Sequence, residues 1–268
     1  MTRIYALVNQ KGGVGKTTTA ISLAAFLAES GQRVLLVDFD PQANATACLG
    51  IDHAQVDGGA YAVVIGGSPV MEKILHNTRL RLSLLPSSAA LAGAQVELVE
   101  LEQRESVLAK ALAPLRGRYD YILIDCPPSL GLLTVNALVA ADGVLIPVQC
   151  EYLALEGLSS LVATLQRMRS RLAPRLAIRG IVLTMFDSRT HLAQDVVQEV
   201  RRHFSGQVFR SIIPRSVRLA EAPSHGLPIS AYDPHSTGGQ AYLALTRELL
   251  AGDGVRRQAA PAAAEAQP

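Results

Sequence analysis

A glycine-rich segment with two lysines near the amino terminus carries the residue types that bind phosphate. Residues 10–18 read Gln-Lys-Gly-Gly-Val-Gly-Lys-Thr-Thr, directly after an apolar run at 4–8 and directly before a helical pattern. Glycines let backbone amides turn inward around phosphate oxygens, and a helix amino terminus adds positive potential. The spacing predicts that Lys16 reaches the β- and γ-phosphates and that the Thr17 hydroxyl binds Mg²⁺. The nucleotide-binding residues expected in this loop are Lys11, Gly12, Gly13, Val14, Gly15, Lys16, Thr17 and Thr18.

Two apolar segments that end in aspartate supply carboxylates for metal binding and hydrolysis. The run at 34–37 leads into Asp38 and Asp40, which alternation places on the same side of an extended chain. One carboxylate of such a pair can hold a metal-bound water while the other orients an attacking water. The run at 121–124 ends at Asp125, which is the Walker B pattern, in which the carboxylate holds Mg²⁺.

The elements that must position these residues alternate between strands and helices. Apolar runs predict strands at 4–8, 34–37, 82–85, 121–124, 144–148, 178–184 and 208–213. Helical patterns lie at about 16–29, 93–115, 130–141, 154–172, 190–204 and 236–250. Runs that are apolar throughout are typical of strands covered on both faces. We therefore predict a doubly wound α/β fold, with a mostly parallel sheet flanked by helices and ligands at the carboxyl ends of the strands.

Length and composition favour one large domain. The chain has 268 residues, of which 49% are hydrophobic and 18% charged, and no linker-like stretch interrupts it. We expect an ATPase domain over residues 1–251 and a disordered tail over 252–268, where alanine, proline and glutamine predominate. The three scattered cysteines, Cys48, Cys126 and Cys150, and the absence of a signal or membrane-spanning run predict a cytoplasmic protein. The six histidines show no metal-ligand spacing.

Positive charge is concentrated in one part of the chain. The formal net charge of +2 would by itself predict no nucleic-acid partner. Residues 151–230, however, contain 11 arginines and 6 acidic residues, whereas residues 1–150 are slightly acidic. The residues alone leave two interpretations open, a solvated arginine-rich face and a surface that binds phosphate backbones.

The loop with its additional lysine, Lys11, resembles the deviant Walker A motif of the ParA/MinD group of ATPases. The segments at 38–42, 125–138 and 213–224 resemble the Soj/ParA chromosome-partitioning branch, and the resemblance covers residues 3–250. It implies a P-loop NTPase of the deviant Walker A type that hydrolyses ATP slowly with Mg²⁺. It further implies that ATP drives a homodimer, which binds double-stranded DNA non-specifically in association with the nucleoid. A ParB-type centromere-binding protein would stimulate hydrolysis and release.

The same resemblance implies roles for individual residues. Lys11 would cross the dimer interface to the partner's ATP, and Asp40 would align the hydrolytic water. The catalytic residues implied are Lys11, Lys16 and Asp40. The residues implied at the metal are Thr17, Asp38 and Asp125, with Asp38 in support. Pro214 and Arg215 would pass near the adenine, and Arg189 and Arg218 would bind the DNA backbone.

The segment at 151–158 and the choice between related functions stay open. Glu151 and Glu156 lie where a helix is expected to begin, so they are either helix-start charges or functional carboxylates. The resemblance places this segment near the dimer interface. The alternative function is a ParA-like or MinD-like ATPase that positions another cargo or acts at a membrane, although the carboxyl terminus lacks a basic amphipathic pattern. A small-molecule ligase on a similar fold is a further alternative.

Overall fold

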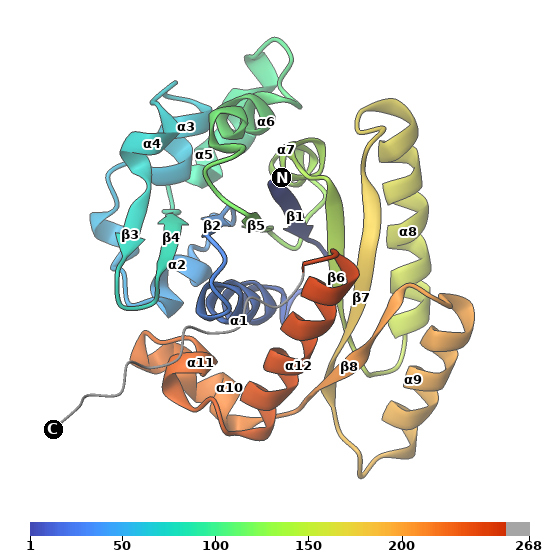
Figure 1. Cartoon of the computed structure of the whole chain (residues 1–268). Helices are drawn as coiled ribbons and strands as arrows, with labels where there is room; N and C mark the ends of the chain where they lie inside the picture. The colour runs from blue at the N-terminus through green and yellow to red at the C-terminus, as the bar shows by residue number, and fades with distance from the viewer. Residues whose placement is uncertain (256–268) are drawn as a thin grey trace, which may run out of the picture.

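An eight-stranded sheet forms the centre of the computed structural model, which describes residues 1–255 (Figure 1). The strands are β1 (Arg3–Leu7), β2 (Val34–Asp38), β3 (Leu75–Asn77), β4 (Leu82–Leu85), β5 (Tyr121–Asp125), β6 (Gly143–Gln149), β7 (Ala177–Phe186) and β8 (Val208–Pro214). Their order is β3-β4-β2-β5-β1-β6-β7-β8. Every neighbouring pair is parallel except the edge pair β3 and β4. The predicted fold class is confirmed.

Helices cover both faces of the sheet. One face packs against α1 (Lys16–Glu29), α2 (Asn44–Cys48), α10 (Val217–Glu221), α11 (Ile229–Tyr232) and α12 (Thr237–Gly252). The other packs against α3 (Gly59–Val64), α4 (Val70–Lys73), α5 (Leu91–Glu97), α6 (Val107–Leu112), α7 (Leu132–Ala140), α8 (Ala154–Arg171) and α9 (His191–His203). Within residues 1–255, none of the helices has the length and apolar character needed to cross a membrane.

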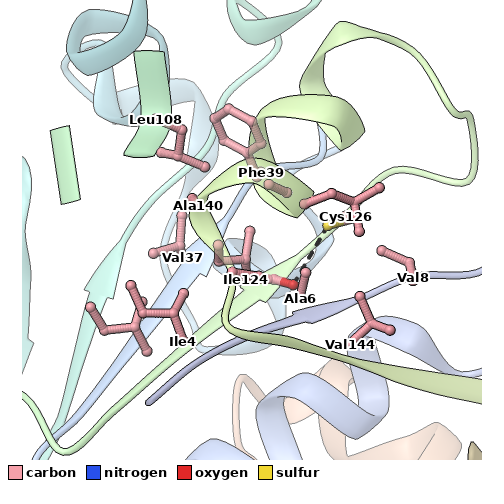
Figure 2. Close-up of a cluster of buried hydrophobic side chains, with 14 of the residues drawn as sticks. Ile4, Ala6, Val8, Val37, Phe39, Leu108, Ile124, Cys126, Ala140 and Val144 are labelled. Carbon is pink, nitrogen blue, oxygen red and sulfur yellow. Dashed lines mark hydrogen bonds between the residues drawn. The ribbon is translucent and has the colours of Figure 1, made fainter. Parts of the chain in front are cut away.

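Alternating side chains of the central strands build the two cores. In β5, Ile122 and Ile124 enter the core beneath α6 and α7, whereas Tyr121 and Leu123 enter the core beneath α1. Figure 2 shows part of the first core, where Cys126 lies among apolar side chains and its thiol donates to the Ile124 carbonyl at 3.7 Å. Burial raises the pKa of the Cys126 thiol well above its usual range, which disfavours thiolate chemistry.

The single helix expected over about 93–115 is wrong. The segment forms two short helices, α5 and α6, separated by the exposed residues 99–103. Gln103 has a φ of 54°, a left-handed conformation that interrupts a right-handed helix. Leu98 and Leu108 on either side are both fully buried in the same core, which is why the sequence keeps an apolar pattern across the break. The antiparallel edge strand β3 was not expected, because its three residues are all exposed.

The end of α12 is fastened to the amino ends of the strands. The Asp253 carboxylate accepts hydrogen bonds from the Tyr5 hydroxyl, the Tyr121 hydroxyl and Arg179 Nε, each at 2.8 Å. Its side chain is only 4% exposed. We expected a disordered tail over residues 252–268, yet α12 extends through Gly252 and the Asp253 side chain packs against the strands. The rest of that expected tail, residues 256–268, lies outside the described residues.

We predict that Asp253→Ala lowers the free energy of unfolding by about 3 kcal/mol, because it leaves a half-buried arginine and two hydroxyls without their acceptor. Urea unfolding monitored by circular dichroism measures the change. Asp57→Ala is the matched control, because Asp57 pairs with Lys73 at the surface with a side chain that is 96% exposed. A destabilisation no larger than that of the control would show that Asp253 does not fasten α12 to the sheet.

Candidate functional site

The glycine-rich loop leads from the end of β1 into α1 with backbone amides left open. Gly13 and Gly15 have φ values of +74° and +86°, which side chains with a Cβ rarely adopt. Within the described chain, no side chain caps the start of α1. The amides of its first turn therefore have no intrahelical acceptor and face the loop, where an anion is electrostatically favoured. This arrangement fits a phosphate group.

Strands β6 and β7 hold the loop in place. The Thr184 hydroxyl of β7 donates to the Val14 carbonyl at 2.9 Å, and Asn9 Nδ2 donates to the Pro147 carbonyl of β6 at 2.7 Å. Asn9 Oδ1 in turn accepts the Lys11 amide at 3.0 Å. Neither Asn9 nor Thr184 was singled out in the sequence, since each acts through a partner more than 130 residues away.

The two loop lysines point in different directions. Lys16 is buried, and its amine donates to the Lys11 carbonyl at 3.1 Å inside the loop. Burial lowers the pKa of Lys16, while the carboxylate of Asp125 acts in the opposite sense. The Lys11 side chain is instead 58% exposed and forms an ion pair with Glu151, which follows β6. Thr17 and Thr18 are half-buried in the first turn of α1.

Asp125 ends β5 in a completely buried position. Among residues 1–255, no donor makes a hydrogen bond of good geometry to either of its oxygens, although the Thr17 hydroxyl is near enough to lower its pKa. Burial, the largest effect, raises the pKa of Asp125 well above its usual range, and the neighbouring Asp38 carboxylate raises it further. A buried carboxylate without a donor is costly. A cation beside Asp125 and Thr17 would supply the positive charge that this buried carboxylate lacks.

Asp38 lies beside Asp125 but is already engaged by protein donors. The two residues are direct partners in the register of β2 and β5. One Asp38 oxygen accepts both the amide and the hydroxyl of Thr46 at 2.7 Å, and the other accepts the Asp40 amide at 3.3 Å. Burial raises the pKa of Asp38 to about 6, while the bonds from Thr46 oppose that rise. These contacts favour a supporting role for Asp38 over direct metal ligation.

Asp40 follows β2 in a turn that hydrogen bonds from Gln42 and Ser87 hold in place. Its Oδ1 accepts the Gln42 amide at 2.9 Å, and its carbonyl accepts the buried Ser87 hydroxyl at 2.8 Å. The Ser87 amide donates to the Thr46 hydroxyl at 2.9 Å. Thr46 and Ser87 therefore link Asp38 to Asp40. In the sequence, Thr46 and Ser87 are marked only as polar residues near an apolar run.

The site residues nearest the loop fit Mg²⁺ bound together with a nucleotide. Within residues 1–255, no three carboxylate, thiol or imidazole side chains enclose a metal site on their own. Mg²⁺ commonly takes one or two protein carboxylates and completes its coordination with water and phosphate oxygens. Asp125 and Thr17 provide such a partial set, with Asp38 alongside.

The remaining predicted residues also lie at or after the carboxyl ends of strands, but they come from β7 and β8 and the segments that follow them. Pro214 ends β8 beside Phe186, and the Arg215 amide donates to the Phe186 carbonyl at 2.9 Å. β8 is three strands from β1, so Pro214 and Arg215 do not join the cluster around Asp125. Arg189 and Arg218 are exposed, with side chains 84% and 55% accessible.

Both of these exposed arginines already have carboxylate partners. Arg189 pairs with Asp187 at 2.7 Å, and its guanidinium lowers the pKa of Asp187 to about 2. Arg218 pairs with Glu221 at 2.9 Å and lies 3.5 Å from Asp233. Ion pairs between exposed side chains are weak, so either arginine can exchange its carboxylate for another anion.

We predict that Thr46→Val lowers the free energy of unfolding by about 2 kcal/mol, because it removes a donor to Asp38 and the acceptor of the Ser87 amide in a buried position. Thermal and urea unfolding measure the loss. Thr164→Val on α8 is the control and should change stability by less than about 0.5 kcal/mol, because the hydroxyl donates to the Ser160 carbonyl and accepts from Arg167 at the surface. Equal stability of the two variants would mean that Thr46 does not hold the aspartates.

Comparison with known proteins identifies the family. A protein-family model described as an AAA domain matches residues 2–178. The chain is 56% identical over 252 residues to the chromosome partitioning protein ParA of Myxococcus xanthus, covering 94% of this chain and 89% of that protein. It is 52% identical over 251 residues to the sporulation initiation inhibitor protein Soj of Bacillus subtilis, covering 94% and 99%.

Solved structures give the same fold. The cobyrinic acid a,c-diamide synthase of Mycobacterium smegmatis, crystallised with bound ADP and magnesium, superposes with a TM-score of 0.83 at 37% identity. The match covers 96% of this chain and 98% of that one. With the family model and the two close curated relatives, the site geometry leads to one conclusion. The chain belongs to the ParA/Soj family of chromosome-partitioning ATPases.

Proposed function

We propose that this protein is a partitioning ATPase in which the nucleotide state controls DNA binding. The proposal rests on one observation: the uncapped start of α1, with buried Lys16, lies beside the aspartates that end β2 and β5. Lys16 would exchange its bond to the Lys11 carbonyl for the β- and γ-phosphates of ATP. Asp125 and Thr17 would hold Mg²⁺, which supplies positive charge against the phosphate oxygens.

Asp40 is the residue we assign to the hydrolytic water. Its turn is fixed by Gln42 and Ser87, so its carboxylate is held beside the loop without large movement. Such a carboxylate can orient a water and accept its proton as the bond to the γ-phosphate breaks. A preorganised but single group of this kind is consistent with slow intrinsic turnover that a ParB-type partner accelerates.

Lys11 is the residue we assign to dimerisation. Its amine lies on the exposed side of the loop, away from Lys16, and is retained by a single ion pair with Glu151. An exposed pair of this kind is worth little. Lys11 can therefore leave Glu151 for the nucleotide of a second subunit, and ATP-dependent association would follow from that exchange.

DNA binding is assigned to Arg189 and Arg218. Both are exposed and come from the arginine-rich part of the chain. Closing two subunits would present four such arginines to one duplex, and multivalent phosphate contacts raise affinity without sequence preference. Location at the nucleoid would follow from this binding.

A second candidate function is an ATP-dependent ligase acting on a small molecule, which the likeness to the Mycobacterium smegmatis synthase favours. The partition proteins are more similar in sequence, at 52% and 56% identity against 37% for the synthase. We therefore place partitioning first. Positioning of another cargo by the same ATPase cycle is the nearest variant of this proposal.

We predict that Lys16→Ala weakens ATP binding by about 10- to 100-fold, the loss expected for one charge-assisted hydrogen bond in a buried site. Isothermal titration calorimetry with an ATP analogue and Mg²⁺ measures it. Lys110→Ala on α6 removes a lysine that bonds Gln103 at the surface and should leave affinity unchanged. Unaltered affinity in Lys16→Ala would refute the assignment of the loop.

We predict that Asp40→Ala with ATP binds random-sequence duplex DNA, whereas the same variant with ADP does not. In that background Arg189→Glu or Arg218→Glu should reduce DNA affinity at least about tenfold. Arg33→Glu is the matched control. Arg33 is 58% exposed and is likewise paired with a carboxylate, but it directly precedes β2 and so lies at the amino ends of the strands. Fluorescence anisotropy measures all four proteins.

Salt dependence gives an independent check on the DNA contacts. Four arginines on phosphate predict a roughly hundredfold fall in affinity between about 50 and 200 mM salt. Binding that is equal with ATP and ADP, or that survives both charge reversals, would contradict the proposed switch and its arginines.

A further inference from the structure

A concave pocket lies at the amino ends of β2, β4 and β5, and we define it as the arginine pocket. Its volume is about 500 Å³, which is in the range of sites that bind small molecules. Its lining includes Arg33, His76, Arg81, Ser83 and Arg118. β2 separates this pocket from the aspartates of the nucleotide site, and its five residues span roughly 16 Å. The pocket is therefore a separate place on the molecule.

The charge around this pocket is positive. Three arginines line it from three different segments, since Arg33 precedes β2, Arg81 precedes β4 and Arg118 precedes β5. Among the described residues, no carboxylate belongs to the lining. Within residues 1–255, the pair of Arg33 with Asp120 at 2.7 Å is the only ion pair that involves an arginine of the pocket. The guanidiniums of Arg81 and Arg118 therefore leave two positive charges without a counter-charge.

Backbone hydrogen bonds fix two of these arginines relative to each other. The Asp120 amide donates to the Arg33 carbonyl at 2.8 Å, and the Arg33 amide donates to Asp120 Oδ2 at 2.9 Å. The Gly117 amide donates to the Thr2 hydroxyl at 2.7 Å, which holds the turn that carries Arg118. Because the backbones are already fixed, only side-chain freedom is lost when these arginines bind a ligand.

Arg81 occupies a position at which glycine would be unstrained. It has a φ of 52° in the turn between β3 and β4, a left-handed backbone that costs a residue with a Cβ about 1–2 kcal/mol. The Arg81 side chain is exposed and adds nothing to the core. Strained positions of this kind persist most often at functional sites. The strain is consistent with a use for the guanidinium that this turn presents.

His76 and Ser83 add further hydrogen-bonding groups to the pocket. They are direct partners in the register of β3 and β4, and His76 Nδ1 lies 2.9 Å from the Ser83 hydroxyl oxygen. Ser83 is buried, whereas His76 is exposed. In the described part of the chain, the other ring nitrogen of His76, Nε2, makes no hydrogen bond, so it can donate to an anion when it carries a proton.

We propose that the arginine pocket is a second anion site, distinct from the nucleotide site, and that it binds a diphosphate group. Its two unpaired guanidiniums match the two phosphates of such a group, and a planar guanidinium can donate two hydrogen bonds at once to phosphate oxygens. A concave pocket suits a small anion, whereas a nucleic-acid strand is bound along an extended positive groove. Inorganic pyrophosphate and the diphosphate of a nucleotide share this chemistry.

Chemical modification of arginine tests the site directly. Phenylglyoxal reacts with accessible guanidiniums, and mass spectrometry reports the rate at each residue. Inorganic pyrophosphate without Mg²⁺ should slow the modification of Arg81 and Arg118 at least about fivefold at saturation, because hydrogen bonds to phosphate protect a guanidinium. Arg175, an exposed arginine between α8 and β7, should react at an unchanged rate. The phosphate loop, residues 10–18, contains no arginine, so pyrophosphate bound there does not enter this readout.

The variant Arg81→Gly removes one guanidinium without straining the backbone, because glycine adopts a φ of 52° readily. The pyrophosphate concentration that half-protects Arg118 should rise at least about tenfold, the loss expected for one charge-assisted hydrogen bond. Arg175→Gly is the matched control and should leave that concentration unchanged. Urea unfolding checks that both variants are folded. Arg118→Ala gives the reciprocal test, which is read through the protection of Arg81.

Separate arms with pyrophosphate and with ADP, both without Mg²⁺, distinguish the two sources of the diphosphate. Protection of Arg81 and Arg118 at a lower concentration of ADP identifies a nucleotide as the ligand. Protection at a lower concentration of pyrophosphate identifies the inorganic anion. Both readings come from arginines of the pocket, so occupation of the phosphate loop by ADP does not affect them.

Three results would overturn the proposed diphosphate site. The first is equal protection by potassium chloride at the same ionic strength, which would be screening alone. The second is an unchanged half-protecting concentration in Arg81→Gly. The third is protection by random-sequence duplex DNA and not by pyrophosphate, which would make the pocket part of a nucleic-acid surface. Arg81→Gly should bind an ATP analogue with Mg²⁺ as the unaltered chain does, so failure at the pocket leaves the ATPase assignment standing.

Discussion

Two buried carboxylates in register at the ends of neighbouring strands set the main constraint on this structure. Asp38 and Asp125 are both inaccessible to water and lie opposite each other in β2 and β5. Burial raises the pKa of both groups, and the Asp38 carboxylate raises that of Asp125 further. The fold tolerates the pair because Thr46 satisfies one carboxylate and because Lys16 stands near the other. The remaining need of Asp125 for positive charge is what makes the site suited to Mg²⁺ and nucleotide.

In that site, the sheet supplies fixed supports and the glycine-rich loop supplies unpaired amides. β6 and β7 hold the loop through Asn9 and Thr184, so its glycines keep conformations that leave amides unpaired. Asp40 is held in a similar way, because the buried Ser87 hydroxyl donates to its carbonyl. Preorganised donors and carboxylates need little rearrangement when charge develops on a phosphate. At the amino ends of the strands, Asp253 joins α12 to β1, β5 and β7.

Lys11 and Glu151 join the phosphate loop to the segment that links β6 and α8. Their ion pair is exposed and weak, so small changes in its surroundings can break it. Such a pair can be exchanged at low cost, which a strongly buried pair could not.

Local pattern alone was enough to predict the chemistry of the loop, the aspartates that end β2 and β5, and most strands and helices, because each depends on residues close together in the chain. The pattern could not reveal that Gln103 breaks the helix expected over 93–115, since both halves bury leucines in one core. Nor could it place Thr46 and Ser87 on the aspartates, Asp253 on two tyrosines, or Glu151 on Lys11. The amino-acid sequence by itself determined which groups can bind phosphate and metal. Only the tertiary structure decided which of them meet, because strand order and register bring together residues that are tens to hundreds of positions apart.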